Sequence, residues 1–164
     1  MEGWIDRKYC GVAGENVVRY LIVSKMFNVS ELKKNTEYMA DALSGACQQG
    51  LRSVHVPLLE SNRQILVMLT QLGFIPNTWY SVGPFNGYGD IRVFLAYKNG
   101  KSYINHLEYV GLEVPFEEFR DDPEYEDVII VFVRRVGIIT RAEALTLESC
   151  VGQDIVALIE ICHL

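Results

Sequence analysis

Strand-like and helix-like patterns alternate through residues 17–97, and this order constrains the fold more than any other feature of the sequence. Residues 17–23 form a nearly continuous apolar run rich in β-branched side chains, as expected for a strand covered on both faces. A polar stretch follows, and apolar residues then recur at helical spacing up to Gly50, where a helix cap is expected. Residues 54–59 form a second apolar run. The pattern predicts two neighbouring parallel strands joined by a crossover helix over residues 35–49.

A second helix and an aromatic hairpin are predicted next. Ser61 or Asn62 is placed to cap a helix whose apolar residues recur until Gly73. Two aromatic-rich strands follow, over residues 78–82 and 91–97, and the glycine-rich residues 83–89 between them are typical of a hairpin connection. The sequence therefore predicts an α/β fold, a mixed sheet with two crossover helices.

The last third of the chain is predicted to form an α+β extension, with a boundary near Gly100. Residues 1–100 would be the α/β core, and residues 101–164 would pack on it. Residues 103–114 and 128–133 are strand-like, 141–149 favour a short helix, and 155–162 fit either a buried strand or a terminal helix. The apolar runs 128–133 and 155–161 are too hydrophobic to stay exposed, so they should pack on the sheet or on a second copy of the chain, giving a homodimer.

The acidity of the chain is local. Between Glu108 and Asp127 there are nine carboxylates and one base, a net of −8 in a chain whose net charge is −6. Pro115 and Pro123 interrupt this segment, which predicts a solvated connector. An acidic chain is not expected to bind a nucleic-acid backbone. No apolar run approaches the roughly 18 residues of a membrane span, and the first residues carry no basic leader, so a cytoplasmic protein without membrane contact is expected.

The four cysteines and three histidines show no spacing typical of a disulfide framework or a metal site. Cys10, Cys47, Cys150 and Cys162 are isolated in the sequence and are expected to be reduced, structural thiols. No metal cofactor is therefore expected.

One stretch resembles a known family. Asn62 opens the sequence Asn-Arg-Gln-Ile-Leu-Val-Met-Leu-Thr-Gln-Leu-Gly-Phe, which ends at Phe74. An asparagine after a strand, an amphipathic helix and Leu-Gly-Phe at this spacing, preceded by a helix ending in Gly50, resemble the C-terminal half of the GCN5-related N-acetyltransferase superfamily in a shortened form. The resemblance implies an acyl-CoA N-acyltransferase core with acetyl-CoA or another acyl-CoA as cofactor. It also implies transfer of the acyl group to an amine of a small molecule or a protein.

The same resemblance implies a cofactor site. The pantetheine arm would lie between two splayed parallel strands, and the pyrophosphate would sit on backbone N–H groups at the start of the following helix. The implied cofactor-binding residues are Val23, Ser24, Lys33, Lys34, Asn35 and Asn62, with Asn62 anchoring the end of the second strand. The family's Q/R-x-x-G-x-G/A loop falls on residues 30–35, where both glycines are missing, so the two lysines would supply positive charge instead.

The catalytic residues implied by the resemblance are incomplete. Many members carry a tyrosine general acid where this chain has Leu69, which has no proton to donate. Tyr80 is a candidate substitute, and Glu60, at the end of the second strand, is a candidate base acting through water. The alternative is a non-catalytic, acetyltransferase-like module that binds a ligand or a partner protein.

Overall fold

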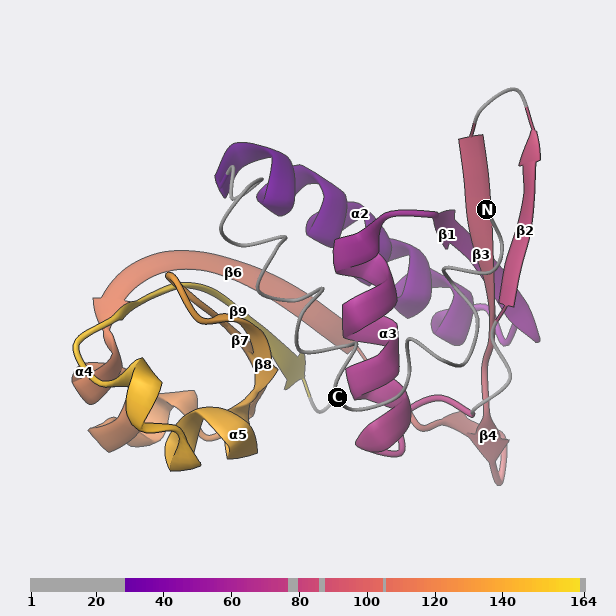
Figure 1. Cartoon of the computed structure of the whole chain (residues 1–164). Helices are drawn as coiled ribbons and strands as arrows, with labels where there is room; N and C mark the ends of the chain where they lie inside the picture. The colour runs from indigo at the N-terminus through magenta and orange to yellow at the C-terminus, as the bar shows by residue number, and fades with distance from the viewer. Residues whose placement is uncertain (1–28, 77–79, 86–87, 105, 163–164) are drawn as a thin grey trace.

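The computed structural model describes residues 29–76, 80–85, 88–104 and 106–162, which form a mixed α+β structure with antiparallel sheets (Figure 1). The helices are α2 (Val29–Gln48), α3 (Glu60–Gln71), α4 (Phe116–Asp121) and α5 (Arg141–Thr146), with the 3₁₀ turns η3 (Pro123–Tyr125) and η4 (Glu148–Cys150). The strands are β1 (Ser53–Pro57), β2 (Tyr80–Phe85), β3 (Tyr88–Phe94), β4 (Tyr97–Lys98), β5 (Lys101–Ser102), β6 (His106–Pro115), β7 (Val128–Val133), β8 (Gly137–Thr140) and β9 (Asp154–Cys162). None of the described helices is long and apolar enough to cross a membrane.

The first sheet has the strand order β1-β3-β2, with antiparallel neighbours throughout. Val56 of β1 lies opposite Ile91 of β3, and both side chains are fully buried. β2 and β3 form the predicted hairpin. Phe85 pairs with Tyr88, so the two strands extend farther into the glycine-rich segment than the sequence indicates.

The parallel neighbours expected for this sheet are not found among the described strands. β1 and β2 both run antiparallel to β3, so they point the same way, but β3 lies between them. Helix α3 follows β1 and precedes the hairpin, as predicted. Residues 17–23, the predicted partner of residues 54–59, lie outside the described residues. The local sequence pattern indicates that each strand exists. The position of β3 between β1 and β2 depends on pairing between distant segments, which the local pattern does not show.

Helices α2 and α3 end in the same way, at the two glycines that the sequence predicts as caps. Gly50 has φ +69° and Gly73 has φ +84°, a left-handed conformation that costs glycine little. The N–H of Leu51 then donates to Ala46 O at 3.0 Å, and the N–H of Phe74 donates to Leu69 O at 2.9 Å. These bonds satisfy carbonyl groups that a helix end would otherwise leave unpaired.

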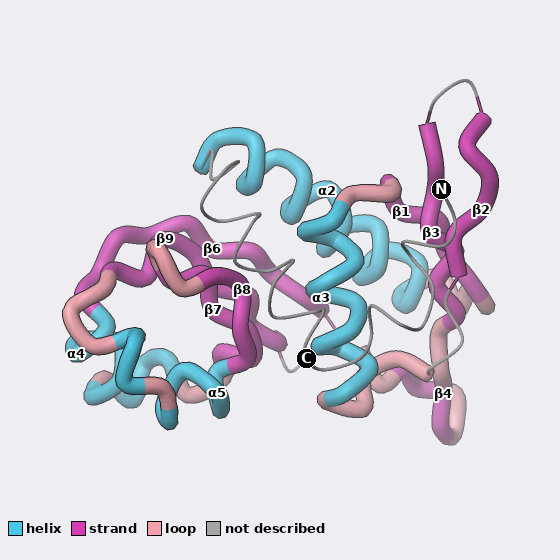
Figure 2. Tube along the Cα trace, viewed as in Figure 1, coloured by secondary structure: helices cyan, strands magenta, loops and turns pink. Residues whose placement is uncertain are grey.

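Among the described strands, β4 and β5 pair only with each other, in a short antiparallel ladder. The second large sheet has the order β6-β9-β7-β8 and is antiparallel throughout. Strand β7 has the predicted bounds, and residues 154–162 form a strand, which decides between the two alternatives for this segment. One face of this sheet belongs to the same hydrophobic cluster as α2, α3 and the first sheet, through residues such as Phe132 and Ile159. The other face packs on α4, α5 and η4, which gather on the side away from α2 and α3 (Figure 2).

The acidic segment is not the connector that the sequence predicts. Residues 106–115 form β6, and helix α4 and turn η3 follow directly. Leu107 and Tyr109 alternate with the exposed Glu108, so the strand keeps its apolar side chains inside and its carboxylates in solvent. In α4, Phe116 and Phe119 are buried. The high density of carboxylates in this segment suggests a connector, but its apolar residues determine the local structure.

Helix α2 links the two sheets. It runs along β6, as Figure 1 shows, and Ser44 in its buried face contacts that strand directly. The N–H of Leu107 donates to Ser44 Oγ at 2.9 Å. Since β6 is an edge strand of the second sheet, the helix hydroxyl satisfies a backbone group at this edge.

Candidate ligand-binding site at the start of helix α3

The candidate site is the tight turn between β1 and α3. Leu59 is the N-cap residue of α3, and no side chain caps the helix. Pro57 O, at the end of β1, accepts hydrogen bonds from the N–H of Leu59 at 2.9 Å and from Asn62 Nδ2 at 3.1 Å. The Asn62 side chain therefore holds the end of the strand against the first turn of the helix.

A close backbone approach supports this turn from β3. The N–H of Leu58 donates to Gly89 O at 2.9 Å. A β-carbon at Gly89 would collide with the Leu58 side chain. Glycine at this position therefore lets the turn rest directly on the first sheet.

Three consecutive polar residues in the first turns of α3 are fully buried: Asn62, Arg63 and Gln64. The Arg63 guanidinium forms an ion pair with the Glu60 carboxylate and donates a hydrogen bond to it from Nε. Burial of long polar side chains costs free energy unless each polar atom is paired. The Glu60–Arg63 pair meets part of this requirement for two of the polar residues of the turn.

Other buried atoms of the turn lack partners. Within the described part of the chain, neither amide atom of Gln64 has a hydrogen bond, and Asn62 Oδ1 also has none. A buried polar group left unpaired costs about 1–3 kcal/mol. One amide N–H₂ donor and two carbonyl acceptors are thus buried without partners in the first turns of α3. Such a set fits a neutral polar ligand that carries its own amide groups.

The electrostatics of the turn are close to neutral. Burial raises the pKa of the Glu60 carboxyl, while the hydrogen bond and positive charge of Arg63 act in the opposite direction. The carboxylate nearly offsets the guanidinium charge and also lies in the first turn, where the helix dipole favours negative charge. The turn therefore favours an uncharged group of a ligand more than a second anion.

The structure separates the other predicted site residues from this turn. The sequence predicts that Lys33, Lys34 and Asn35 lie at the start of a helix. Helix α2 begins at Val29, so these residues lie inside it. Their backbone N–H groups lie beyond the first turn, where N–H groups bond to carbonyls of the preceding turn, so no anion-binding loop forms there. Both lysines are exposed, and Lys33 forms an ion pair with Glu37 at 3.9 Å. The helix start predicted at these residues is therefore wrong, because α2 begins upstream at Val29.

Three further candidates remain. Val23 and Ser24 lie outside the described residues. Tyr80 is the first residue of β2 and lies opposite Arg92 in the strand register. Leu69, at the position of the family's tyrosine, is fully buried. Among the described residues, no group of three or more His, Cys, Asp or Glu side chains is placed to hold a metal ion.

Sequence reasoning missed Arg63 and Gln64. Asn62 to Leu69 are eight consecutive buried residues, so α3 is covered on every side and has no solvent-facing stripe here. The apolar spacing used to place this helix assumes such a stripe, and it assigns polar residues to the exposed side. The sequence signal that could have identified them is their position: two long polar residues come directly before an unbroken apolar run.

No model of a known protein family matches the chain, and no curated protein matches it.

Proposed function

We propose that this protein is an acetyltransferase-like module that binds acyl-CoA at the turn between β1 and α3. The observation that carries the proposal is the buried, unpaired amide of Gln64, two residues after Asn62, whose Oδ1 is also buried and unpaired. The pantetheine arm of coenzyme A contains two amides, each with one N–H donor and one carbonyl acceptor. Those groups match the unpaired atoms of the turn in number and kind, and binding would offset the cost of burying them.

The order of elements supports the same proposal. A glycine-capped helix, a strand, an asparagine in the next helix and a glycine-capped Leu-Gly-Phe follow one another as the resemblance implies. Asn62 also holds the strand end, which is the position in which the resemblance places it. The acyl-CoA N-acyltransferase core is thus part of the proposal, with α2 and α3 as its two helices.

Transfer to an amine requires a base, and Glu60 is the described residue best suited to it. An alkylammonium acceptor must lose a proton before its nitrogen attacks the thioester carbonyl and the C–S bond breaks. A carboxyl whose pKa is raised by burial accepts that proton more readily than an ordinary one. The departing thiolate then takes a proton from solvent, because Leu69 has none to give.

Binding without catalysis is the second candidate, and one contact favours it. Glu60 is held by Arg63 through both an ion pair and a hydrogen bond, which lowers its freedom to reach an acceptor. A turn built in this way would bind the cofactor or a partner peptide and leave it unchanged.

The test compares Gln64→Met with Gln71→Met, which changes the same residue type at an exposed position of the same helix. In wild type, acetyl-CoA should raise the melting temperature and give a measurable Kd by isothermal titration. Gln64→Met should raise the stability of the free protein by about 1 kcal/mol, because it removes an unpaired buried amide, and should weaken acetyl-CoA binding at least tenfold. Gln71→Met should change neither.

Two outcomes would contradict the proposal. Acetyl-CoA at millimolar concentration without effect on wild-type melting would remove the acyl-CoA function. Equal binding by wild type and Gln64→Met would remove the site. If binding is found, release of free thiol in the presence of amines distinguishes the two candidates: Glu60→Gln should abolish transfer and retain binding if Glu60 is the base.

A further inference from the structure

Three exposed apolar side chains lie close together in the sequence, between α5 and the residue after η4. Seven large apolar side chains are exposed among the described residues, and three of them lie within seven residues of one another. These are Leu145, Leu147 and Val151, with exposed fractions of 40%, 38% and 56%. The other four are distributed over α2, the turns after α2 and α3, and the segment before β6. Isolated exposed residues are ordinary, whereas three together mark a candidate interaction surface.

This outer apolar patch rests on a rigid support. The N–H groups of Leu147, Cys150 and Val151 donate to Glu143 O, Leu147 O and Glu148 O, at 3.0 to 3.2 Å. The chain from α5 through η4 is therefore a series of closed turns. Ala144 and Cys150 are fully buried beneath it, in the cluster that covers the outer face of the second sheet.

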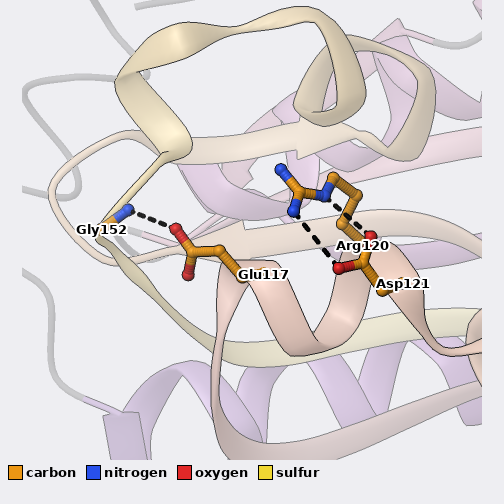
Figure 3. A network of polar contacts seen from close by, with 4 residues as sticks. All are labelled: Glu117, Arg120, Asp121 and Gly152. Atoms are coloured by element: carbon orange, nitrogen blue, oxygen red, sulfur yellow. Dashed lines mark hydrogen bonds and ion pairs between the residues drawn. The ribbon is translucent and has the colours of Figure 1, made fainter.

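The surroundings of the patch are acidic. The Glu117 carboxylate accepts a hydrogen bond from the N–H of Gly152 at 3.0 Å, which fixes a negative charge beside Val151 (Figure 3). Arg120, the base of the acidic segment, is paired with the neighbouring Asp121 through two hydrogen bonds of 2.9 and 3.2 Å. Glu148 lies within the patch and is exposed. Negative charge therefore dominates the rim, apart from Arg141 at the start of α5.

We propose that this patch is the docking site for a cationic amphipathic helix or short segment of another protein. Apolar side chains of the partner would cover Leu145, Leu147 and Val151, and its lysines or arginines would meet Glu117 and Glu148. A second copy of the chain fits poorly, because a two-fold contact would place acidic rim against acidic rim. The small apolar area suits one amphipathic segment better than a globular surface.

The test uses a synthetic helical peptide with leucine at helical spacing and lysine at the remaining positions, titrated into the full-length protein. Binding in the micromolar range is expected, and it should weaken as salt is added because charge pairs at the rim are exposed. Val151→Asp and Glu148→Lys should each weaken binding about tenfold. Tyr38→Asp and Asp41→Lys, which make matched changes on exposed positions of α2, should leave it unchanged.

Three results would overturn the proposal. Equal binding of a peptide with glutamate in place of every lysine would show that charge does not select the partner. Equal binding by Val151→Asp and wild type would place the contact elsewhere. Self-association of the free protein that Val151→Asp abolishes, measured by sedimentation, would identify a second copy as the occupant. Unchanged melting curves of the variants would show that any loss of binding comes from the patch and not from misfolding.

Discussion

Three neighbouring carboxylates oppose the ionisation of Glu160. It lies opposite Glu108 in the register of β6 and β9. Burial raises its pKa first, and the negative charges of Glu108, Asp127 and Glu124 raise it further. A raised pKa means that the folded protein binds this proton more tightly than the unfolded chain. The resulting stabilisation is complete below the ordinary glutamate pKa and is lost as the pH rises through the raised value.

We therefore expect Glu160→Gln to stabilise the protein at neutral pH. Like charges opposite one another across two strands cost about 0.2–1 kcal/mol, and this substitution removes that repulsion. The gain should shrink on acidification and vanish near about pH 3, where the wild-type carboxyl is protonated in both states. Chemical denaturation at a series of pH values measures it, with exposed Glu126→Gln as the control. A gain that did not depend on pH would show that charge is not its cause.

At the scale of residues, the candidate site was only partly predictable. Asn62 was identified from its place before Leu-Gly-Phe, and its bond to Pro57 O fits that assignment. Lys33, Lys34 and Asn35 were placed at a helix start by counting back from Gly50, but the helix continues upstream to Val29. Nothing in the local sequence makes the helix start at Lys33–Asn35, because the upstream residues Glu31 and Leu32 favour helix as much as the residues that follow. Gln64 could not be identified from the sequence, because its burial depends on the covering of α3 on all sides, which is a tertiary property.

The contact between α2 and β6 gives a prediction at the scale of elements. Ser44→Ala would leave the N–H of Leu107 without its 2.9 Å bond to the hydroxyl, in a buried position. An unpaired buried donor costs about 1–3 kcal/mol, so the free energy of unfolding should fall by this amount. Ser149→Ala, at an exposed position of η4, is the matched control and should have almost no effect. Denaturant melts measure both, and a loss equal to that of the control would show that the bond adds nothing.

Elements whose ends carry a local signal were predicted well. Gly50 and Gly73 cap their helices because a left-handed residue is needed at each end, and that need is visible in the sequence. Strand β7 was predicted to the residue because it is a short apolar run between charged segments. The acidic segment was misinterpreted because two prolines and many carboxylates resemble a connector. Pro115 in fact ends β6, and Pro123 begins a 3₁₀ turn.

At the scale of the whole molecule, the two sheets share one hydrophobic cluster. It contains Leu43 and Leu66 from the helices, Ile91 from the first sheet, and Phe132 and Ile159 from the second. Segments 128–133 and 155–161 are buried, as their composition predicts, except for the partly buried Ile129 and Glu160. The pattern of one sequence segment does not show which other segment will cover it. The order β1-β3-β2 and the packing of α2 on β6 therefore could not be derived from periodicity.

The shared cluster leads to a prediction about how the molecule unfolds. The Phe132 ring is fully buried and packs edge-on against Tyr109, with ring centroids 5.8 Å apart. Phe132→Ala should cost about 3–5 kcal/mol, a large part of the stability of a typical domain. Because this cluster also contains β1 and β3, the destabilisation should reach the first sheet. Thermal unfolding should remain a single transition at a lower temperature.

Hydrogen exchange distinguishes this result from independent unfolding of two domains. If the molecule unfolds as one unit, Phe132→Ala should accelerate exchange of the β3 amides, such as Val93, as much as exchange of the β9 amides, such as Ile159. Phe132→Leu retains most of the side-chain volume and should cause a smaller change of the same kind in both sheets. Unchanged protection of β3 with loss of protection in β9 would contradict shared unfolding. That outcome would favour two domains divided near Gly100, because a boundary with separate cores confines the loss of packing to one side.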